Sequence, residues 1–119
     1  MANWVYGHNG QATIIHDNDC FRSNLGEVIA WINGNNVYSL AGLHVGWFDG
    51  GVLYGSDNNV IGFVRDCTSG LPSRPGIGGT PGTPGFSGRP GRPGLGGVPG
   101  RPGRGGWSSN SLLDYFKLL

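Results

Sequence analysis

The sequence contains few charged residues, only two cysteines and no proline before Pro72. Charged residues make up 13% of the 119 residues, and no apolar run approaches the roughly 18 residues that a membrane span needs. The first residues, Met1-Ala2-Asn3-Trp4, do not begin a secretory signal, which leaves the localisation open with the cytoplasm as the default. A chain of this length accommodates one small domain with an appendage and excludes two full domains.

Glycine and proline are abundant but unevenly placed. All eight prolines lie from Pro72 onward, and 14 of the 25 glycines lie between Gly76 and Gly106. This distribution predicts a domain over residues 3–70, a Gly/Pro tract over 71–106 and an apolar docking segment over 107–119.

The first segment is an internal repeat of 16 residues with two apolar columns and two turn columns. The bulky apolar column consists of Ile15, Trp31, Trp47 and Phe63, and the second apolar column consists of Val5, Phe21, Val37 and Leu53. One turn column consists of Gly10, Gly26, Gly42 and Asn58, and the other includes Gly34 and Gly50. A fixed period of this kind indicates a repeated supersecondary unit.

Each unit is predicted to be a β-hairpin. Asn33-Gly34 and Asp49-Gly50 lie between β-rich runs, which is a strong short-range hairpin signal. Closing eight short strands into a ring removes the unpaired edges, and we expect one central core of stacked aromatics. The predicted fold class is all-β, a pseudo-fourfold shallow ring or barrel of four 16-residue β-hairpin repeats, followed by a polyproline-II tract and a short C-terminal helix.

Several of these runs resemble the repeats of bacterial 4-fold β-flower proteins. The resemblance is carried by Gly26-Glu27-Val28-Ile29-Ala30-Trp31-Ile32, Val37-Tyr38 and Gly42-Leu43-His44-Val45-Gly46-Trp47-Phe48-Asp49-Gly50, and it extends to Trp107-Ser108-Ser109 and Tyr115-Phe116. It implies a shallow, symmetric all-β fold, and it brings no catalytic residues with it.

The tract has glycine at every third position from Gly76 to Gly106, and proline often stands just before the next glycine. This pattern is typical of collagen-like sequences, because only glycine fits at the axis of three packed polyproline-II chains. Three arrangements stay open: packing between chains, packing of the tract on the ring, and a semi-rigid linker that reaches somewhat under about 100 Å.

The final segment is strongly apolar and opens with a Ser-x-x-Asp capping pattern at 111–114. Its predicted docking residues are Trp107, Leu112, Leu113, Tyr115 and Phe116. A helix this short is not stable alone, so we expect it to dock on a groove, a neighbouring subunit or a lipid surface. Docking on protein is favoured, because a membrane anchor of this length is weak without a second signal.

The small net charge of +1 hides an asymmetry between the two halves. Residues 1–70 contain two arginines and six carboxylates, a net charge of −4, whereas residues 71–119 contain six basic residues and one carboxylate, a net charge of +5. The candidate residues for polyanion binding or self-association are Arg74, Arg89, Arg92, Arg101 and Arg104. These arginines are only moderately dense, and no aromatic residues alternate with them to stack on bases. Self-association is therefore favoured over binding to nucleic acid, and binding to a membrane surface stays possible.

The residues that carry chemistry show no catalytic or metal-binding pattern. Cys20 and Cys67 lie in the second turn column of the first and last repeats, so a disulfide at the ring closure and two reduced thiols are both open, with the thiols favoured. His8, His16 and His44 share no ligand spacing with the cysteines. No cofactor and no small-molecule substrate is predicted.

These observations predict a non-enzymatic structural protein, a homo-oligomer or polymer in which the tract mediates or spans assembly. The alternative is a peripheral binding module that uses the ring face and the Arg-rich tail to engage a membrane or another polyanion. Salt separates the two functions, because only polyanion binding falls steeply as salt is added.

Overall fold

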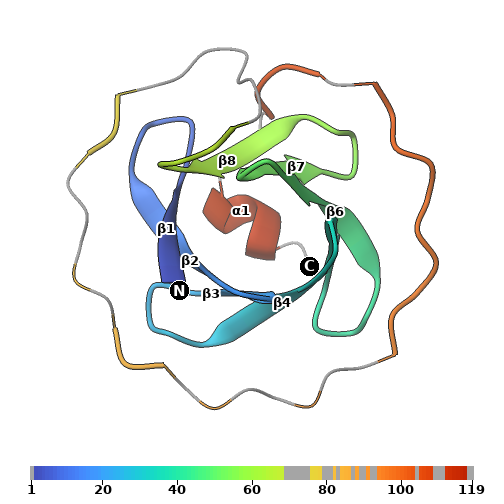
Figure 1. The fold of residues 1–119 in the computed structure, drawn as a ribbon, viewed down its shortest axis with the longest axis horizontal. Coiled ribbons are helices and arrows are strands. Elements are labelled where there is room, and N and C mark those ends of the chain that lie inside the picture. Colours follow the sequence, from blue (N-terminus) through green and yellow to red (C-terminus); the bar gives the residue numbers. More distant parts are fainter. Residues whose placement is uncertain are drawn as a thin grey trace.

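The computed structural model describes residues 2–68, 76–78, 82, 84–86, 88, 91, 94–103, 105–108 and 112–117. Its elements are β1 (Ala2–Tyr6), β2 (Ala12–Asp17), β3 (Cys20–Arg22), β4 (Val28–Asn33), β5 (Asn36–Tyr38), β6 (His44–Asp49), β7 (Val52–Gly55), β8 (Val60–Val64) and α1 (Leu112–Lys117). The eight strands form one closed antiparallel barrel in chain order, with β8 paired to β1 (Figure 1). The predicted all-β ring is therefore confirmed.

Each repeat contains the same β-bulge. The register shifts at four equivalent places, namely Val5/Tyr6, Phe21/Arg22, Val37/Tyr38 and Leu53/Tyr54. Because a bulge bends a strand and increases its twist, one bulge per repeat allows strands of only three to six residues to close into a barrel. The molecule is a shallow disc of 36 × 36 × 23 Å.

Four equivalent five-residue segments, which we call the mouth loops, join β1 to β2, β3 to β4, β5 to β6 and β7 to β8 at residues 7–11, 23–27, 39–43 and 55–59, and the last of them begins with Gly55 at the end of β7. The fourth residue of each loop has a positive φ: +78° at Gly10, +87° at Gly26, +88° at Gly42 and +61° at Asn58. The predicted turn residues Gly34 and Gly50 lie in the hairpin turns at the opposite end, with φ of +61° and +59°. Left-handed backbone favours glycine and, among other residues, asparagine, which accounts for both turn columns.

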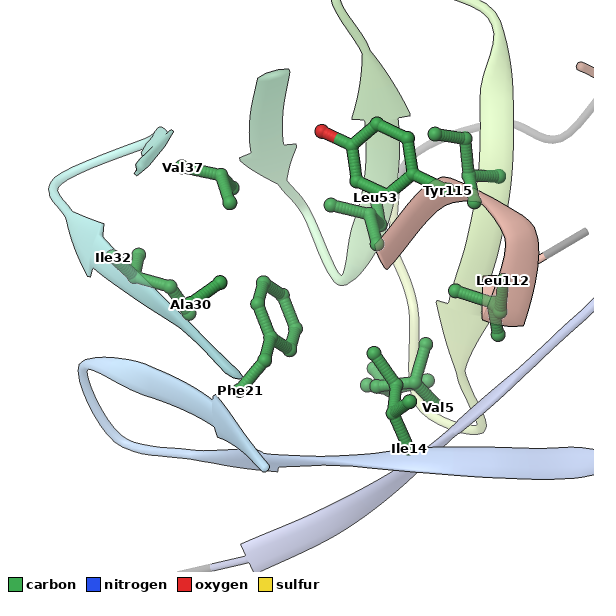
Figure 2. Packing of buried hydrophobic residues seen from close by; sticks show 11 residues of the cluster. Val5, Ile14, Phe21, Ala30, Ile32, Val37, Leu53, Leu112 and Tyr115 are labelled. Carbon is green, nitrogen blue, oxygen red and sulfur yellow. The ribbon is translucent and has the colours of Figure 1, made fainter. Parts of the chain in front are cut away.

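The two apolar columns face opposite sides of the barrel, which corrects the expectation of a single central core of stacked aromatics. Val5, Phe21, Val37 and Leu53 are buried inside the barrel together with side chains of α1 (Figure 2). Ile15, Trp31, Trp47 and Phe63 are equally well buried, but they belong to separate clusters on the outer face.

The size of the interior explains this arrangement. Adjacent strand residues point to opposite faces. Three of the four residues just before the bulky column are small, namely Ala30, Gly46 and Gly62, and the fourth is Ile14. A Cβ atom on Gly46 would lie 2.8 Å from the Tyr115 hydroxyl, and one on Gly62 would lie 3.0 Å from the Leu112 methyl groups. The interior is therefore filled by α1, and the large rings take the outer face.

Helix α1 lies within the ring at the end that carries the mouth loops (Figure 1). Leu112 and Tyr115 are buried, the Tyr115 hydroxyl donates a hydrogen bond to the Val45 carbonyl, and the Phe116 ring lies 5.8 Å from that of Phe21. Burial raises the pKa of Tyr115 well above its usual value. Among the described residues there is no helix with the length and hydropathy to cross a membrane.

Candidate functional site: the outer aromatic layer and the tract around it

The outer face of the barrel carries a layer of large apolar side chains, which we call the outer aromatic layer. Its members are Trp4, Tyr6, Ile15, Trp31, Tyr38, Trp47, Tyr54 and Phe63. The described parts of the tract lie outside the strands and follow the ring around (Figure 1). Ile77 packs against the cluster that contains Tyr6, and Leu95 packs against the cluster that contains Trp31. The tract therefore covers the outer aromatic layer.

Backbone hydrogen bonds join the tract to the fourth residue of three mouth loops. The N–H of Gly78 donates to the carbonyl of Gly10 at 2.8 Å, Gly96 donates to Gly42 at 2.8 Å, and Gly105 donates to Asn58 at 3.2 Å. These donors are separated by multiples of nine residues. The equivalent position for the second repeat is Ser87, which lies outside the described residues.

The tract passes so close to Gly10 and Gly26 that a side chain at either position would have no room. A Cβ atom on Gly10 would lie 1.8 Å from the Gly76 carbonyl oxygen, and one on Gly26 would lie 2.1 Å from that of Gly85. Both positions also have positive φ. Any side chain there would strain the loop and push the tract outward.

At the fourth repeat, Arg101 of the tract is anchored to the barrel. Its Nε donates to Asn58 Oδ1 at 2.9 Å, and its Nη1 lies 3.2 Å from Asp49 Oδ2. The guanidinium group lies over the rings of Tyr54 and Trp47, at 4.8 and 5.5 Å from their centroids. The other candidate arginines, Arg74, Arg89, Arg92 and Arg104, lie outside the described residues.

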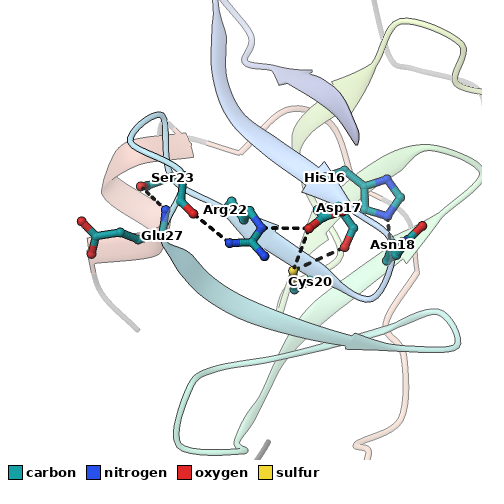
Figure 3. A network of polar contacts seen from close by, with 8 residues as sticks. His16, Asp17, Asn18, Cys20, Arg22, Ser23 and Glu27 are labelled. Atoms are coloured by element: carbon teal, nitrogen blue, oxygen red, sulfur yellow. Dashed lines mark hydrogen bonds and ion pairs between the residues drawn. The ribbon is translucent and has the colours of Figure 1, made fainter. Parts of the chain in front are cut away.

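At the second repeat the barrel provides the cation and the tract provides the aromatic ring. Arg22 of the barrel is 4% exposed and lies 4.5 Å from the Phe86 ring of the tract. Figure 3 shows how it is held: Nε pairs with Asp17 Oδ2 at 2.8 Å, and Nη1 donates to the Gly26 carbonyl at 2.8 Å. Arginine is suited to this position because its planar group can stack and donate hydrogen bonds at the same time.

After the fourth repeat the chain crosses from the outer face toward the mouth through residues 106–108. The Gly106 carbonyl accepts from the N–H of Val60 at 2.9 Å, and the Val60 carbonyl accepts from the N–H of Ser108 at 2.7 Å. The Trp107 ring stacks on His8 with the centroids 4.2 Å apart. Trp107 thus connects the last repeat to the first.

The structure contains no disulfide between Cys20 and Cys67. Cys20 is buried beside Trp31 and Tyr38, whereas Cys67 packs near other clusters. Ring closure joins β1 to β8, but Cys20 begins β3, so closure does not bring the two residues together.

The half-buried histidines His16 and His44 pack against aromatic rings of the barrel. Burial lowers the pKa of His16, against the opposing effects of its hydrogen bond with the Asn18 carbonyl and of the nearby Asp17 carboxylate. Burial also lowers the pKa of His44. Within the described parts of the chain, no group of three His, Cys, Asp or Glu side chains could hold a metal ion.

A shallow groove opens between α1 and the third mouth loop. It has a volume of about 310 Å³ and is lined by Ile29, Ser39, Leu40, Ala41 and Phe116. Exposed leucines stand on the second and third mouth loops: Leu25 is 70%, Leu40 47% and Leu43 66% exposed. We call Leu25, Leu40 and Leu43 the leucine rim.

The tract sequence also has a nine-residue period, which is less obvious than the three-residue period of its glycines and which indicates how the tract is arranged. Triplets without proline recur every nine residues, at 76–78, 85–87, 94–96 and 103–105, and the first three are each followed by two Gly-X-Pro triplets. Their central residues include Ile77, Phe86 and Leu95, which are the tract side chains that contact the barrel. A fourfold tract matched to a fourfold ring was therefore predictable.

A comparison with protein families covers the barrel, the tract and α1 together. A family model described as 4-fold beta flower protein matches residues 3–116. No curated protein and no solved structure matches the chain. The chain belongs to the 4-fold β-flower family.

Proposed function

We propose that this protein is a non-enzymatic structural module that self-associates through the leucine rim, while its tract acts as a belt around its own barrel. The observation that carries the proposal is the exposure of three leucines on two successive mouth loops, of which Leu40 also lines the groove at Phe116. Exposed aliphatic side chains on neighbouring loops are typical of an interaction surface.

The partner we propose for the leucine rim is a second copy of the chain. The four mouth loops contain two carboxylates, Glu27 and Asp57, and no arginine or lysine. An anionic membrane or a nucleic acid would therefore be repelled at this end of the barrel. The leucine side chains themselves carry no charge, so two leucine rims can pack face to face without desolvating a charged group of the rim.

The contacts of Arg101 favour assembly over polyanion binding. This arginine faces Asp49, Asn58 and two aromatic rings of its own barrel. A guanidinium group held in this way has to give up these contacts before it can bind a phosphate.

The belt also fits a polyproline-II conformation in length, and we infer that the tract adopts it. At about 3.1 Å per residue, nine polyproline-II residues span about 28 Å. One quarter of a circle 36 Å across is also about 28 Å. Nine residues of tract per 16-residue repeat is therefore the length that the circumference requires.

Light scattering of the full chain at low and high salt tests the proposal. We expect a mass of at least twice the 12.5 kDa of the chain that does not change with salt. The variant Leu25→Ser/Leu43→Ser should be monomeric, whereas Val98→Ser, which changes a 50% exposed residue of the tract, should leave the mass unchanged. A wild-type monomer at all concentrations would overturn the proposal, and binding to anionic vesicles that salt abolishes would favour the peripheral module instead.

A further inference from the structure

We propose that the outer aromatic layer is a recognition surface for Gly-X-Pro segments in nine-residue steps, and that it can take up the tract of a second copy in place of its own. This surface is separate from the leucine rim, and the inference does not depend on association through that rim.

The contacts of the first and third repeats follow the same plan. An apolar tract residue, Ile77 or Leu95, packs on the outer aromatic layer, and the next residue donates its N–H to a mouth-loop carbonyl. In these two steps the barrel contacts one side chain and one backbone donor of the tract, eighteen residues apart. The remaining residues of each step serve as spacers of fixed length.

The chemistry of the layer is that of a polyproline-II receptor. Polyproline-II segments bind in grooves lined by aromatic side chains, because their extended shape is preformed and little entropy is lost on binding. The layer provides rings in every repeat, for example Tyr6, Trp31, Trp47 and Tyr54. Arg101 stacked on Tyr54 adds a cation–π contact of the kind that arginines in such segments can make.

These contacts are local and noncovalent, so an identical tract from another chain can make them equally well. The tethered tract competes at the high effective concentration that a short connection provides. Exchange between chains therefore requires release of the resident tract, and we expect it to be slow in the intact protein and fast once the tether is cut.

The test uses the full chain of the Leu25→Ser/Leu43→Ser variant, so that association through the leucine rim cannot contribute. A protease site replaces residues 71–74, and the chain is cut after folding. A fluorescent peptide of residues 76–108 is then titrated against the cut protein and followed by polarisation. The control peptide contains the same triplets in an order that destroys the nine-residue period.

We expect saturable binding of the native-order peptide, displacement of the resident tract from the outer aromatic layer while α1 stays in the barrel, and at least tenfold weaker binding of the reordered peptide. Equal binding of the two peptides would overturn the proposal, because the barrel would then not read the nine-residue step. A cut protein that stays folded and binds neither peptide would overturn it as well.

A second measurement uses uncut chains in case the cut protein unfolds. Chains with Asp49→Cys are mixed with chains with Arg101→Cys, both lacking Cys20 and Cys67, and treated with a short bis-maleimide. Cross-linked dimers that accumulate slowly support exchange of tracts. Val98→Cys in place of Arg101→Cys is the control, and dimer yields that match this control would contradict exchange.

Discussion

At the scale of single residues, the fourth position of each mouth loop has two tasks. Its positive φ closes the loop, and in three repeats its carbonyl accepts a hydrogen bond from the tract. Gly10 and Gly42 perform both tasks with no side chain. Asn58 adds a third, because its amide donates to the Pro102 carbonyl at 2.8 Å and accepts from Arg101. The loop is therefore the place where barrel and tract are joined.

The variant Gly26→Ala should destabilise the protein by more than Gly34→Ala. Both residues have positive φ, so alanine introduces backbone strain of about 1–2 kcal/mol at either site. Only at Gly26 would the new Cβ also meet the Gly85 carbonyl oxygen, because no atom lies within 4 Å of a Cβ on Gly34. Urea denaturation measures the total effect.

Amide exchange separates strain from the contact with the tract. In Gly26→Ala the N–H of Gly96, which donates to Gly42, should lose protection as the tract is displaced, whereas in Gly34→Ala it should change only with global stability. Equal protection of Gly96 in the two variants would show that the tract does not depend on the loop.

The stability of the protein should fall as the pH is lowered through about 6.5. Burial lowers the pKa of His16 and of His44 below 6.5, the ordinary value for histidine. The unfolded chain therefore binds more protons than the folded chain between the lowered pKa values and 6.5, and acid favours unfolding. Urea midpoints at pH 7.5 and at about pH 5.5 measure the slope, which should flatten in His16→Gln/His44→Gln. A double variant with the slope of the wild type would show that other groups cause it.

At the scale of elements, α1 supplies part of the core that eight short strands cannot provide. The strands are three to six residues long, and Leu112 and Tyr115 fill the space above Gly46 and Gly62. The helix has six residues and would not be stable in isolation. Barrel and helix therefore stabilise each other, and neither is a complete unit by itself.

The variant Leu112→Ala should reduce the free energy of unfolding by about 3 kcal/mol, because Leu112 is 2% exposed within the barrel. Val98→Ala, at a 50% exposed position of the tract, is the control and should change stability by less than about 0.5 kcal/mol.

A double-mutant cycle tests the fit between helix and barrel. Gly62→Ala places a Cβ 3.0 Å from the Leu112 methyl groups. Removing those methyl groups relieves part of the overlap, so Gly62→Ala should be less destabilising in the Leu112→Ala background than in the wild type. Strict additivity of the two changes would show that Leu112 does not pack on Gly62.

The sequence predicted the strands and turns well and the division of the core poorly. Turn chemistry at Gly34 and Gly50 and a fixed 16-residue period are local signals, so the ring could be derived from them. The inward and outward faces could not, because both apolar columns are buried and each lies on every second strand of the ring. The position of α1 inside the barrel decides which column faces inward. Its contacts join residues that are about 50 or more positions apart in the sequence, such as Tyr115 and Val45.

At the scale of the whole molecule, the ring has a weak seam between its first and last strands. Strands β1 and β8 are joined by two residue pairs, Val5↔Val64 and Tyr6↔Phe63, whereas every other pair of neighbouring strands has at least three. The tract crosses this seam at residues 106–108, where its backbone pairs with Val60 and Trp107 stacks on His8. The belt therefore reinforces the closure at its weakest place.

The variant Trp107→Ala should open this seam before the rest of the barrel unfolds. Loss of the partly buried ring should lower the free energy of unfolding by about 2–3 kcal/mol, as measured by urea denaturation. In hydrogen exchange, the amides of Tyr6 and Val64 should lose more protection than those of Ile32 and Val37 on β4 and β5. His8→Ala removes the stacking partner but leaves the backbone pairing at Val60, so its effect should be smaller and confined to the same amides. If Trp107→Ala lowers protection equally in all strands, the barrel unfolds as one unit and the tract does not act at the seam.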